Sequence, residues 1–80
     1  MKSLRSADHR YLLELLISAR EKAGLTQQQL AARLGKPQSF VAKYEGGERR
    51  IDVIEFLAIA RALNFDPARA VREIAAKYKP

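Results

Sequence analysis

The sequence predicts an all-α fold made of five short helices in one compact domain. Apolar residues recur every three or four positions along most of the chain. The four glycines and three prolines fall at the boundaries of these periodic segments. Valine and isoleucine never alternate with polar residues over the length of a strand. With 80 residues, of which 48% are hydrophobic, we expect a single domain spanning residues 1–80.

The first helix is expected from about Ala7 to Ala23. Either Ser6 or Asp8 could cap its start, and Gly24 follows its end, which is a usual place for a C-terminal glycine. The apolar residues that share one face at helical spacing are Leu12, Leu16, Ala19 and Ala23. Further apolar residues widen this face beyond what a single core needs: Leu13, Leu15 and Ile17.

The second helix is expected to start after Thr26 and to end at Gly35. Thr26 and Gln29 have capping-box spacing, so the hydroxyl can accept from the third helical N–H while Gln29 reaches back. The third helix begins near Pro37, because a proline in the first turn lacks only an N–H that would have no partner there. Gly46 and Gly47 stop it.

Two short helices joined by a turn of about three or four residues cross at a steep angle. Gly35 can take the positive φ that such a turn needs. The residues expected inside the angle are Leu30 and Leu34 from one helix with Val41 and Tyr44 from the other, and Ala31 is small where the second backbone must approach closely. One face of the third helix stays uncovered, and it carries Gln38, Ser39, Ala42 and Lys43.

The fourth helix starts at Asp52, which forms a second predicted capping box with Glu55, and it ends at Asn64. Its expected core side consists of Val53, Phe56, Leu57, Ala60 and Leu63. Asp66 and Pro67 open the fifth helix, expected over about residues 67–78. Its expected apolar face consists of Val71, Ile74, Ala75 and Tyr78.

Composition limits the classes of function. A formal net charge of +6 favours a polyanionic partner, either nucleic acid or an anionic membrane, over an ordinary solvated basic surface. No apolar segment is long enough to cross a membrane, and the absence of cysteine fits a reducing cytosol. We therefore expect a cytoplasmic, nucleoid-associated protein without a membrane partner.

Catalytic and metal chemistry find no support in the sequence. His9 is the one histidine, and in the first turn of a helix without cysteine partners it is expected at the surface. Asp52 and Asp66 are better explained as helix caps than as catalytic groups. We predict no enzyme, no metal site and no cofactor.

The uncovered face of the third helix has the side chains that recognise base edges in the major groove. Glutamine can make paired hydrogen bonds to adenine, lysine can reach the acceptors of guanine, and alanine can touch a thymine methyl group. We therefore expect Gln38, Ser39, Ala42 and Lys43 to contact bases of double-stranded DNA. Arg49 and Arg50 follow this helix, where the duplex backbone would pass, and are predicted phosphate contacts together with Lys36 in the turn.

The stretch from Gly24 to Arg50 resembles the helix-turn-helix of the Cro/C1 repressor family, also called the XRE family. The resemblance covers roughly residues 16–65. Several short motifs carry it together: Arg20, "GLTQ" at 24–27, "LA" at 30–31, "LG" at 34–35, "QS" at 38–39, "KYE" at 43–45 and "ARAL" at 60–63.

The resemblance implies a lambda-repressor-like five-helix fold with the helix-turn-helix at about residues 27–45. It implies that Gln27 contacts a phosphate through its side chain or a helical N–H, and that Arg20 and Glu45 form a structural ion pair. The chain departs from the family pattern at Pro37, which loses a side-chain cap. Phe40 and Tyr44 are bulky, and the ring of Phe40 could face either the DNA or the first helix.

Two functions of different classes follow from this pattern. The first is a sequence-specific transcriptional repressor of bacterial or phage origin that binds a palindromic operator as a homodimer. The surplus apolar residues of the first and fifth helices either pack on each other or form the dimer interface. The second function is an interaction module whose partner is a protein, such as the toxin neutralised by an antitoxin. A purely structural role would leave the polar face of the third helix unexplained.

Overall fold

The computed structural model of the chain describes residues 6–77, and within this range it contains five α-helices and no strand. The helices are α1 (Ala7–Lys22), α2 (Gln27–Leu34), α3 (Gln38–Glu45), α4 (Val53–Leu63) and α5 (Pro67–Lys77). The prediction of an all-α, five-helix fold is confirmed, although Tyr78 lies outside the described residues. No helix in this range is both long and apolar enough to cross a membrane.

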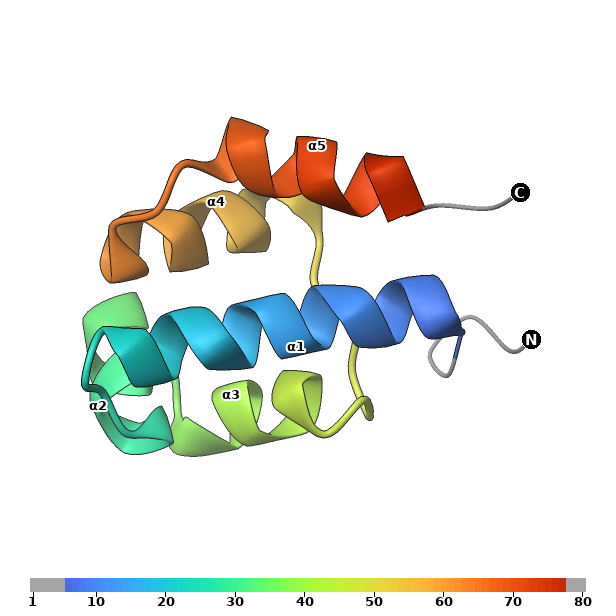
Figure 1. The fold of residues 1–80 in the computed structure, drawn as a ribbon. Coiled ribbons are helices and arrows are strands. Elements are labelled where there is room, and N and C mark those ends of the chain that lie inside the picture. Colours follow the sequence, from blue (N-terminus) through green and yellow to red (C-terminus); the bar gives the residue numbers. More distant parts are fainter. Residues whose placement is uncertain (1–5, 78–80) are drawn as a thin grey trace.

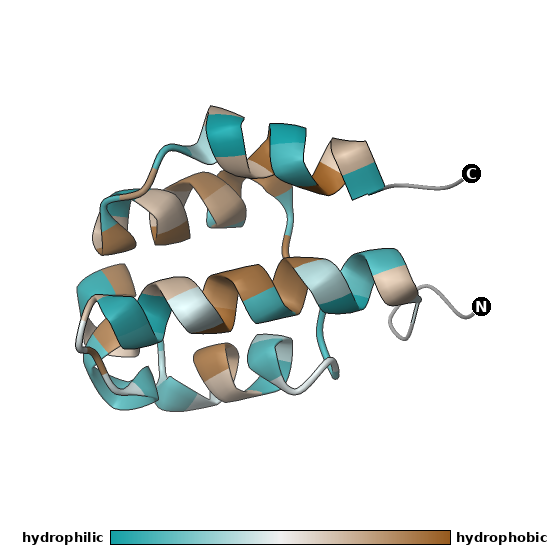
Figure 2. Cartoon of the chain, viewed as in Figure 1, coloured by the Kyte–Doolittle hydropathy of each residue, from teal (hydrophilic) through white to brown (hydrophobic). Residues whose placement is uncertain are grey.

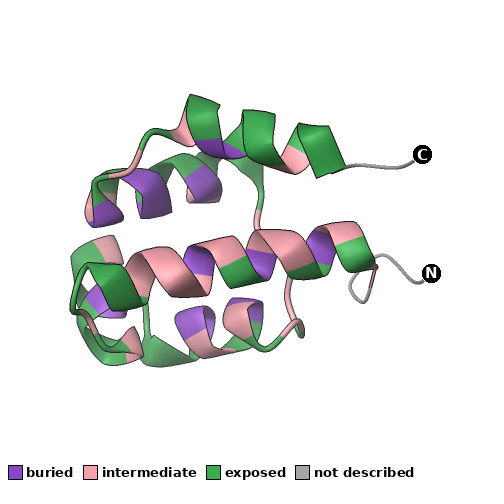
Figure 3. Ribbon diagram, viewed as in Figure 1, coloured by how far each residue is buried: buried purple, intermediate pink, exposed green. Residues whose placement is uncertain are grey.

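The first helix runs through the centre of the domain. Figure 1 shows α1 between α3 on one side and the α4–α5 pair on the other, with α2 across one end. Contacts join α1 to α3 and α5, and α2 to α3 and α4. Figure 3 shows that buried residues lie on the sides of the helices that face this centre, so α1 provides the common support for both halves of the domain.

Local capping chemistry determines where the helices begin. Ser6, and not Asp8, caps α1, because its hydroxyl accepts from the backbone N–H of His9 at 3.1 Å. Thr26 and Asp52 each form the predicted capping box with the residue three positions on. Pro37 precedes α3 without a side-chain cap, as its chemistry predicts.

Left-handed residues end two of the helices. Gly35, with φ 67°, follows α2, and the N–H of Lys36 donates to the carbonyl oxygen of Ala31 at 3.0 Å, which closes the last turn. Asn64, with φ 59°, ends α4 in the same way, and Phe65 donates back to Ala60. Asparagine tolerates this region because its short polar side chain interacts locally.

The core is one apolar cluster with contributions from all five helices. Its fully buried members include Leu16, Leu30, Val41, Tyr44 and Ile59. Leu13 is also buried, whereas Leu12, Leu15 and Ala19 pack against the cluster while only partly covered, and Ala23 is exposed. The widened apolar face of α1 is therefore largely used inside the domain.

The predicted core faces of α4 and α5 agree only in part with the buried faces of these helices. In α4 the buried residues are Phe56, Ile59, Ala60 and Leu63, whereas Val53 and Leu57 are exposed. Figure 2 shows that α4 is apolar along most of its length, so periodicity could not select the buried side. In α5 the small Ala70 is the buried residue and belongs to the core cluster, Ile74 is partly covered, and Val71 and Ala75 are exposed.

The expectation of a surface position for His9 was wrong. His9 is 8% exposed, since it lies four residues before Leu13 and seven before Leu16 on the buried side of α1. Its Nε2 has no hydrogen-bond partner among the described residues. Burial lowers the pKa of His9 below 6.5, and the positive charge of Arg50 lowers it further.

The lowered pKa of His9 predicts a stability loss in mild acid. The unfolded chain binds a proton near pH 6.5 and the folded domain only at lower pH, so the free energy of unfolding falls as pH drops below 6.5. Each unit of pKa difference corresponds to about 1.4 kcal/mol. Urea unfolding at a series of pH values checks this, with His9→Gln as the variant that cannot titrate. Parallel pH profiles for the two proteins would contradict the assignment to His9.

Candidate nucleic-acid interface

The helices α2 and α3 form a sharp two-helix unit. Only residues 35–37 separate them, and Gly35 supplies the positive φ of the turn. Nothing lies within 4 Å of a Cβ added at Gly35, so this position requires glycine for its backbone conformation and not for space. Ala31 and Val41 are buried where the two helices meet. The unit is thereby fixed at its inner side and open at its outer side.

The outer face of α3 is polar and uncovered within the domain. Gln38, Ser39 and Lys43 are exposed and Ala42 is half-buried, while Phe40, Val41 and Tyr44 point into the core. This is the division between inner and outer residues that the sequence predicts. An exposed face of this size and polarity can lie in the major groove of a duplex.

An ion pair fixes the C-terminal end of α3 against α1. The Nε and Nη2 atoms of Arg20 donate to the two carboxylate oxygens of Glu45 at 2.8 and 3.1 Å. The third contact of Arg20, from Nη1 to the carbonyl oxygen of Leu25 at 2.8 Å, fixes the connection between α1 and α2. The side chains are 14% and 5% exposed, and the hydrogen bonding of Arg20 to the Glu45 carboxylate raises the pKa of Arg20. Arg20 therefore joins three elements at one point.

Glutamine side chains extend this ion pair toward the outer face. Gln27 Nε2 donates to Glu45 Oε1 at 2.9 Å, and Gln38 Nε2 donates to Gln27 Oε1 at 3.1 Å. We call the four residues Arg20, Glu45, Gln27 and Gln38 the polar chain. The Arg20–Glu45 pair is the one that the resemblance implies, but sequence reasoning missed the two glutamine contacts, because they depend on tertiary contacts across 18 and 11 positions. The side chain of Gln27 is therefore engaged, and of the two predicted modes of phosphate contact the one through its backbone N–H, in the first turn of α2, stays a prediction.

The predicted phosphate contacts differ in their surroundings. Lys36 and Arg50 are exposed beside α3, as the prediction needs. Arg49 instead pairs with Glu55, with Nη1–Oε1 and Nη2–Oε2 distances of 3.0 and 2.8 Å. Its guanidinium also lies over the ring of Phe40, 4.8 Å from the ring centroid. Direct phosphate contact by any of these side chains stays a prediction.

Phe40 belongs to the core, which resolves the question left open by the sequence. Its ring is 8% exposed and meets Tyr44 edge to face, with ring centroids 5.5 Å apart. Lys36 Nζ lies 5.3 Å from the ring centroid, so two cations flank an aromatic ring beneath the edge of α3. The bulky aromatic residues of α3 therefore serve packing and not base contact.

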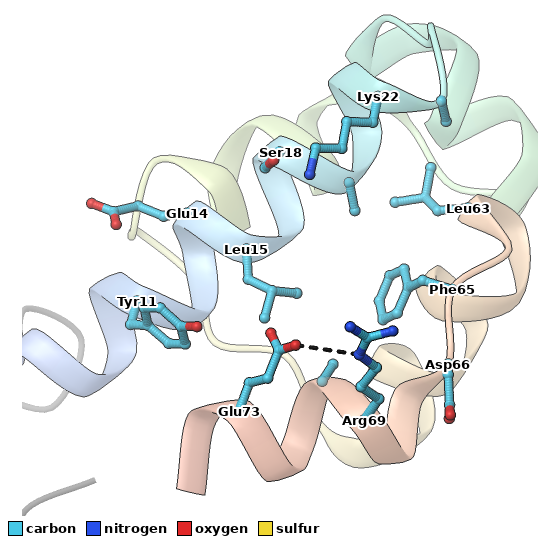
Figure 4. A pocket seen from close by; sticks show the side chains of 13 residues that line it. Tyr11, Glu14, Leu15, Ser18, Lys22, Leu63, Phe65, Asp66, Arg69 and Glu73 are labelled. Atoms are coloured by element: carbon cyan, nitrogen blue, oxygen red, sulfur yellow. Dashed lines mark ion pairs between the residues drawn. The ribbon is translucent and has the colours of Figure 1, made fainter. Parts of the chain in front are cut away.

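Away from α3, the described residues form neither a metal site nor an enclosed cavity of one charge sign. None of their histidine, aspartate and glutamate side chains gather into a cluster able to hold a metal ion. An open groove of about 690 Å³ lies between α1 and α5. Figure 4 shows the side chains of Leu15 and Phe65 pointing into it. Its charged side chains have both signs, and two of them, Arg69 and Glu73, form an exposed ion pair at 3.5 Å. This groove lacks a nucleophile–base pair.

Comparison with known proteins identifies relatives. A family model described as helix-turn-helix matches residues 16–69. An XRE-family like protein from Pseudomonas syringae pv. tomato str. DC3000 is 47% identical, with 98% of this chain and 95% of that chain covered and a TM-score of 0.87. The restriction-modification controller protein C.AhdI from Aeromonas hydrophila is 31% identical, with 80% and 93% covered and a TM-score of 0.73.

A third solved structure shares the fold alone. The clp gene regulator ClgR from C. glutamicum is 20% identical, with 92% of this chain and 95% of that chain covered and a TM-score of 0.77. Among curated proteins, no significant match to the chain was found.

The buried ion pair predicts a strongly non-additive response to mutation. Glu45→Gln should lower the free energy of unfolding by about 3 kcal/mol, because Arg20 would keep its charge in a largely buried place without an anion. Arg20→Met should also destabilise. The double variant should lose clearly less than the sum of the two, as measured by a double-mutant cycle in urea. Additive losses would mean that the two side chains do not stabilise each other.

Proposed function

Because the chain belongs to the XRE family of helix-turn-helix proteins, we propose that it is a sequence-specific transcriptional repressor that binds double-stranded DNA. It acts as a homodimer on a palindromic operator, with one α3 in the major groove of each half-site, and it excludes polymerase by occupancy. The observation that carries this proposal is the uncovered polar face of α3, whose first residue is oriented by the polar chain.

Gln38 is the principal base contact in this proposal. One N–H of its amide is donated to Gln27, which fixes the plane of the amide group. The second N–H and the carbonyl oxygen stay available as a donor–acceptor pair. This pair complements the N7 acceptor and the N6 donor that adenine presents in the major groove. Ser39, Ala42 and Lys43 contact neighbouring bases from the same face. Recognition then begins with a side chain whose orientation is set before DNA arrives.

Phosphate contacts supply the salt-dependent part of affinity. The proposed contacts are the backbone N–H of the half-buried Gln27, the ammonium of the exposed Lys36 and the guanidinium of the exposed Arg50. The net charge of +6 attracts the duplex over a longer range. Affinity should fall steeply as salt rises, because binding releases counterions from the duplex.

An uncovered apolar patch on α4 and α5 is the proposed dimer interface. The four large hydrophobic side chains exposed among the described residues all lie on these two helices: Val53, Ile54, Leu57 and Val71. Val53, Leu57 and Val71 line an apolar groove of about 640 Å³ together with Phe56 and Ile74, and Ile54 follows Val53 directly on α4. The patch differs from the interface expected on the first and fifth helices, because α1 uses most of its apolar surface internally.

The dimensions of the domain agree with a side-by-side dimer. Its principal extents are 35 × 26 × 20 Å. Two such domains in contact have centres roughly 20–35 Å apart, depending on the faces that meet, and this range includes the ~34 Å that separates adjacent half-sites along one face of a duplex.

Selection of bound duplexes from a random library at physiological salt tests the proposed function. An inverted repeat with fixed spacing is the expected result, since it reports sequence-specific binding by a symmetric dimer. Recovery of no motif, with binding that vanishes as salt rises, would overturn the proposal, because the basic charge alone would then explain the attraction.

Replacement of Gln38 tests its contact with a base. Gln38→Ala should cost about 1–3 kcal/mol on the selected operator and relax the preference at one position of each half-site. Binding to random DNA should change little, because the phosphate contacts are retained. Competition binding on operators that carry every base at each position gives both quantities. An equal loss on operator and random DNA would refute base contact.

Replacement of Ile54 tests the dimer interface. The side chain is 73% exposed, so Ile54→Asp should leave the free energy of unfolding within about 0.5 kcal/mol of wild type. It should nevertheless weaken self-association and abolish cooperative occupancy of the two half-sites, as followed by analytical ultracentrifugation with operator DNA. Ala76→Asp introduces the same charge on an exposed part of α5 and should have no such effect. Equal behaviour of the two variants would exclude the patch as the interface.

A further inference from the structure

Three residues fasten the loop between α3 and α4, and we call Phe40, Arg49 and Glu55 the Arg49 latch. Glu55 in the first turn of α4 accepts two hydrogen bonds from the guanidinium of Arg49. That guanidinium lies over the ring of Phe40 in α3, and its Nη1 donates to the carbonyl oxygen of Arg50 at 2.6 Å. The latch thus contacts the first turn of α4, the first turn of α3 and the backbone of the loop between them.

Glu55 has two structural tasks at once. Its Oε1 also accepts from the backbone N–H of Asp52 at 2.9 Å, which completes the capping box of α4. The hydrogen bond from Arg49, followed by that from the backbone of Asp52, lowers the pKa of Glu55 to about 2. The positive charge of Lys36, in the turn before α3, lowers the pKa of Glu55 further. The carboxylate is therefore ionised at every pH at which the protein would bind DNA.

We propose that Glu55 is a positioning residue for DNA binding, which acts by holding Arg49 against Phe40 and thereby fixing the loop that presents Arg50. This inference rests on the proposed function. It adds a role for an acidic residue to which the proposed function gives no contact with a base or a phosphate. Arg49 then serves the loop and not the duplex, because its charge is neutralised by a bidentate partner.

The direction in which DNA affinity changes when Glu55 loses its charge separates this role from the alternative. If Arg49 were a phosphate contact that Glu55 merely restrained, removal of the acidic charge would release it and tighten binding. The latch predicts the opposite, since a loosened loop loses the placement of Arg50. Simple electrostatics also predicts tighter binding when an acidic residue near DNA is removed. A fall in affinity is therefore diagnostic of positioning.

The experiment compares Glu55→Gln with Glu48→Gln on a short random-sequence duplex at several salt concentrations. Glutamine keeps the oxygen that a capping box needs, so Glu55→Gln removes the negative charge and the Nη2–Oε2 hydrogen bond to Arg49 without removing the cap. Its affinity should fall about two- to tenfold, the range expected for the loss of one hydrogen-bonded contact. Glu48 lies exposed in the same loop, and Glu48→Gln should tighten binding about twofold. Affinity that is unchanged or higher in Glu55→Gln would overturn the proposal.

A second measurement, made on the free protein, tests without DNA whether Glu55 holds the loop between α3 and α4. Backbone amide hydrogen exchange at residues 46–51 should accelerate in Glu55→Gln and stay at the wild-type rate in Glu48→Gln. Equal loop protection in Glu55→Gln and wild type would overturn the latch whatever the DNA result. Wild-type protein that binds no duplex would instead overturn the proposed function, while the exchange rates would still decide whether Glu55 holds the loop.

Discussion

The ion pair between Arg20 and Glu45 is the contact on which the outer face of the domain depends. Both side chains are largely buried, and the guanidinium meets both carboxylate oxygens as well as the carbonyl oxygen of Leu25. A charge taken out of water in this way is tolerated only when its partner and its remaining hydrogen bonds are all in place. Its net effect on stability can be small, but it admits one relative position of α1, the α1–α2 connection and α3.

The amide groups of two glutamines connect this relative position of the helices to the orientation of a surface side chain. Gln27 can reach Glu45 only when α2 and α3 meet at their observed angle, which in turn needs the left-handed Gly35 and the small Ala31. Gln38 is then oriented by Gln27. The orientation of one exposed side chain therefore depends on a buried pair, a turn and a helix crossing together. An organised surface of this kind loses less conformational entropy when a ligand binds than a face of free side chains would.

The sequence is sufficient to predict what is decided locally. The caps at Thr26 and Asp52 and the stop at Gly35 depend on residues within four positions of one another, and all are found as predicted. The inner and outer faces of α3 are also as predicted, because a short helix packed on one side has a clear period. Long-range contacts decide the rest. The burial of His9 and the choice of the buried face of α4 depend on where neighbouring helices lie, which periodicity does not contain.

The same distinction applies to charge. Ion pairing leaves the formal net charge of +6 unchanged, so the long-range attraction to a polyanion that composition predicts is unaffected by structure. Short-range contact is a different quantity, because a guanidinium already bound to a carboxylate has fewer donors for a phosphate. Arg49 and Arg50 are indistinguishable as neighbouring arginines in the sequence, yet one is paired with Glu55 and the other is exposed. The number of phosphate contacts, and with it the salt dependence of binding, follows from which cations the fold leaves unpaired.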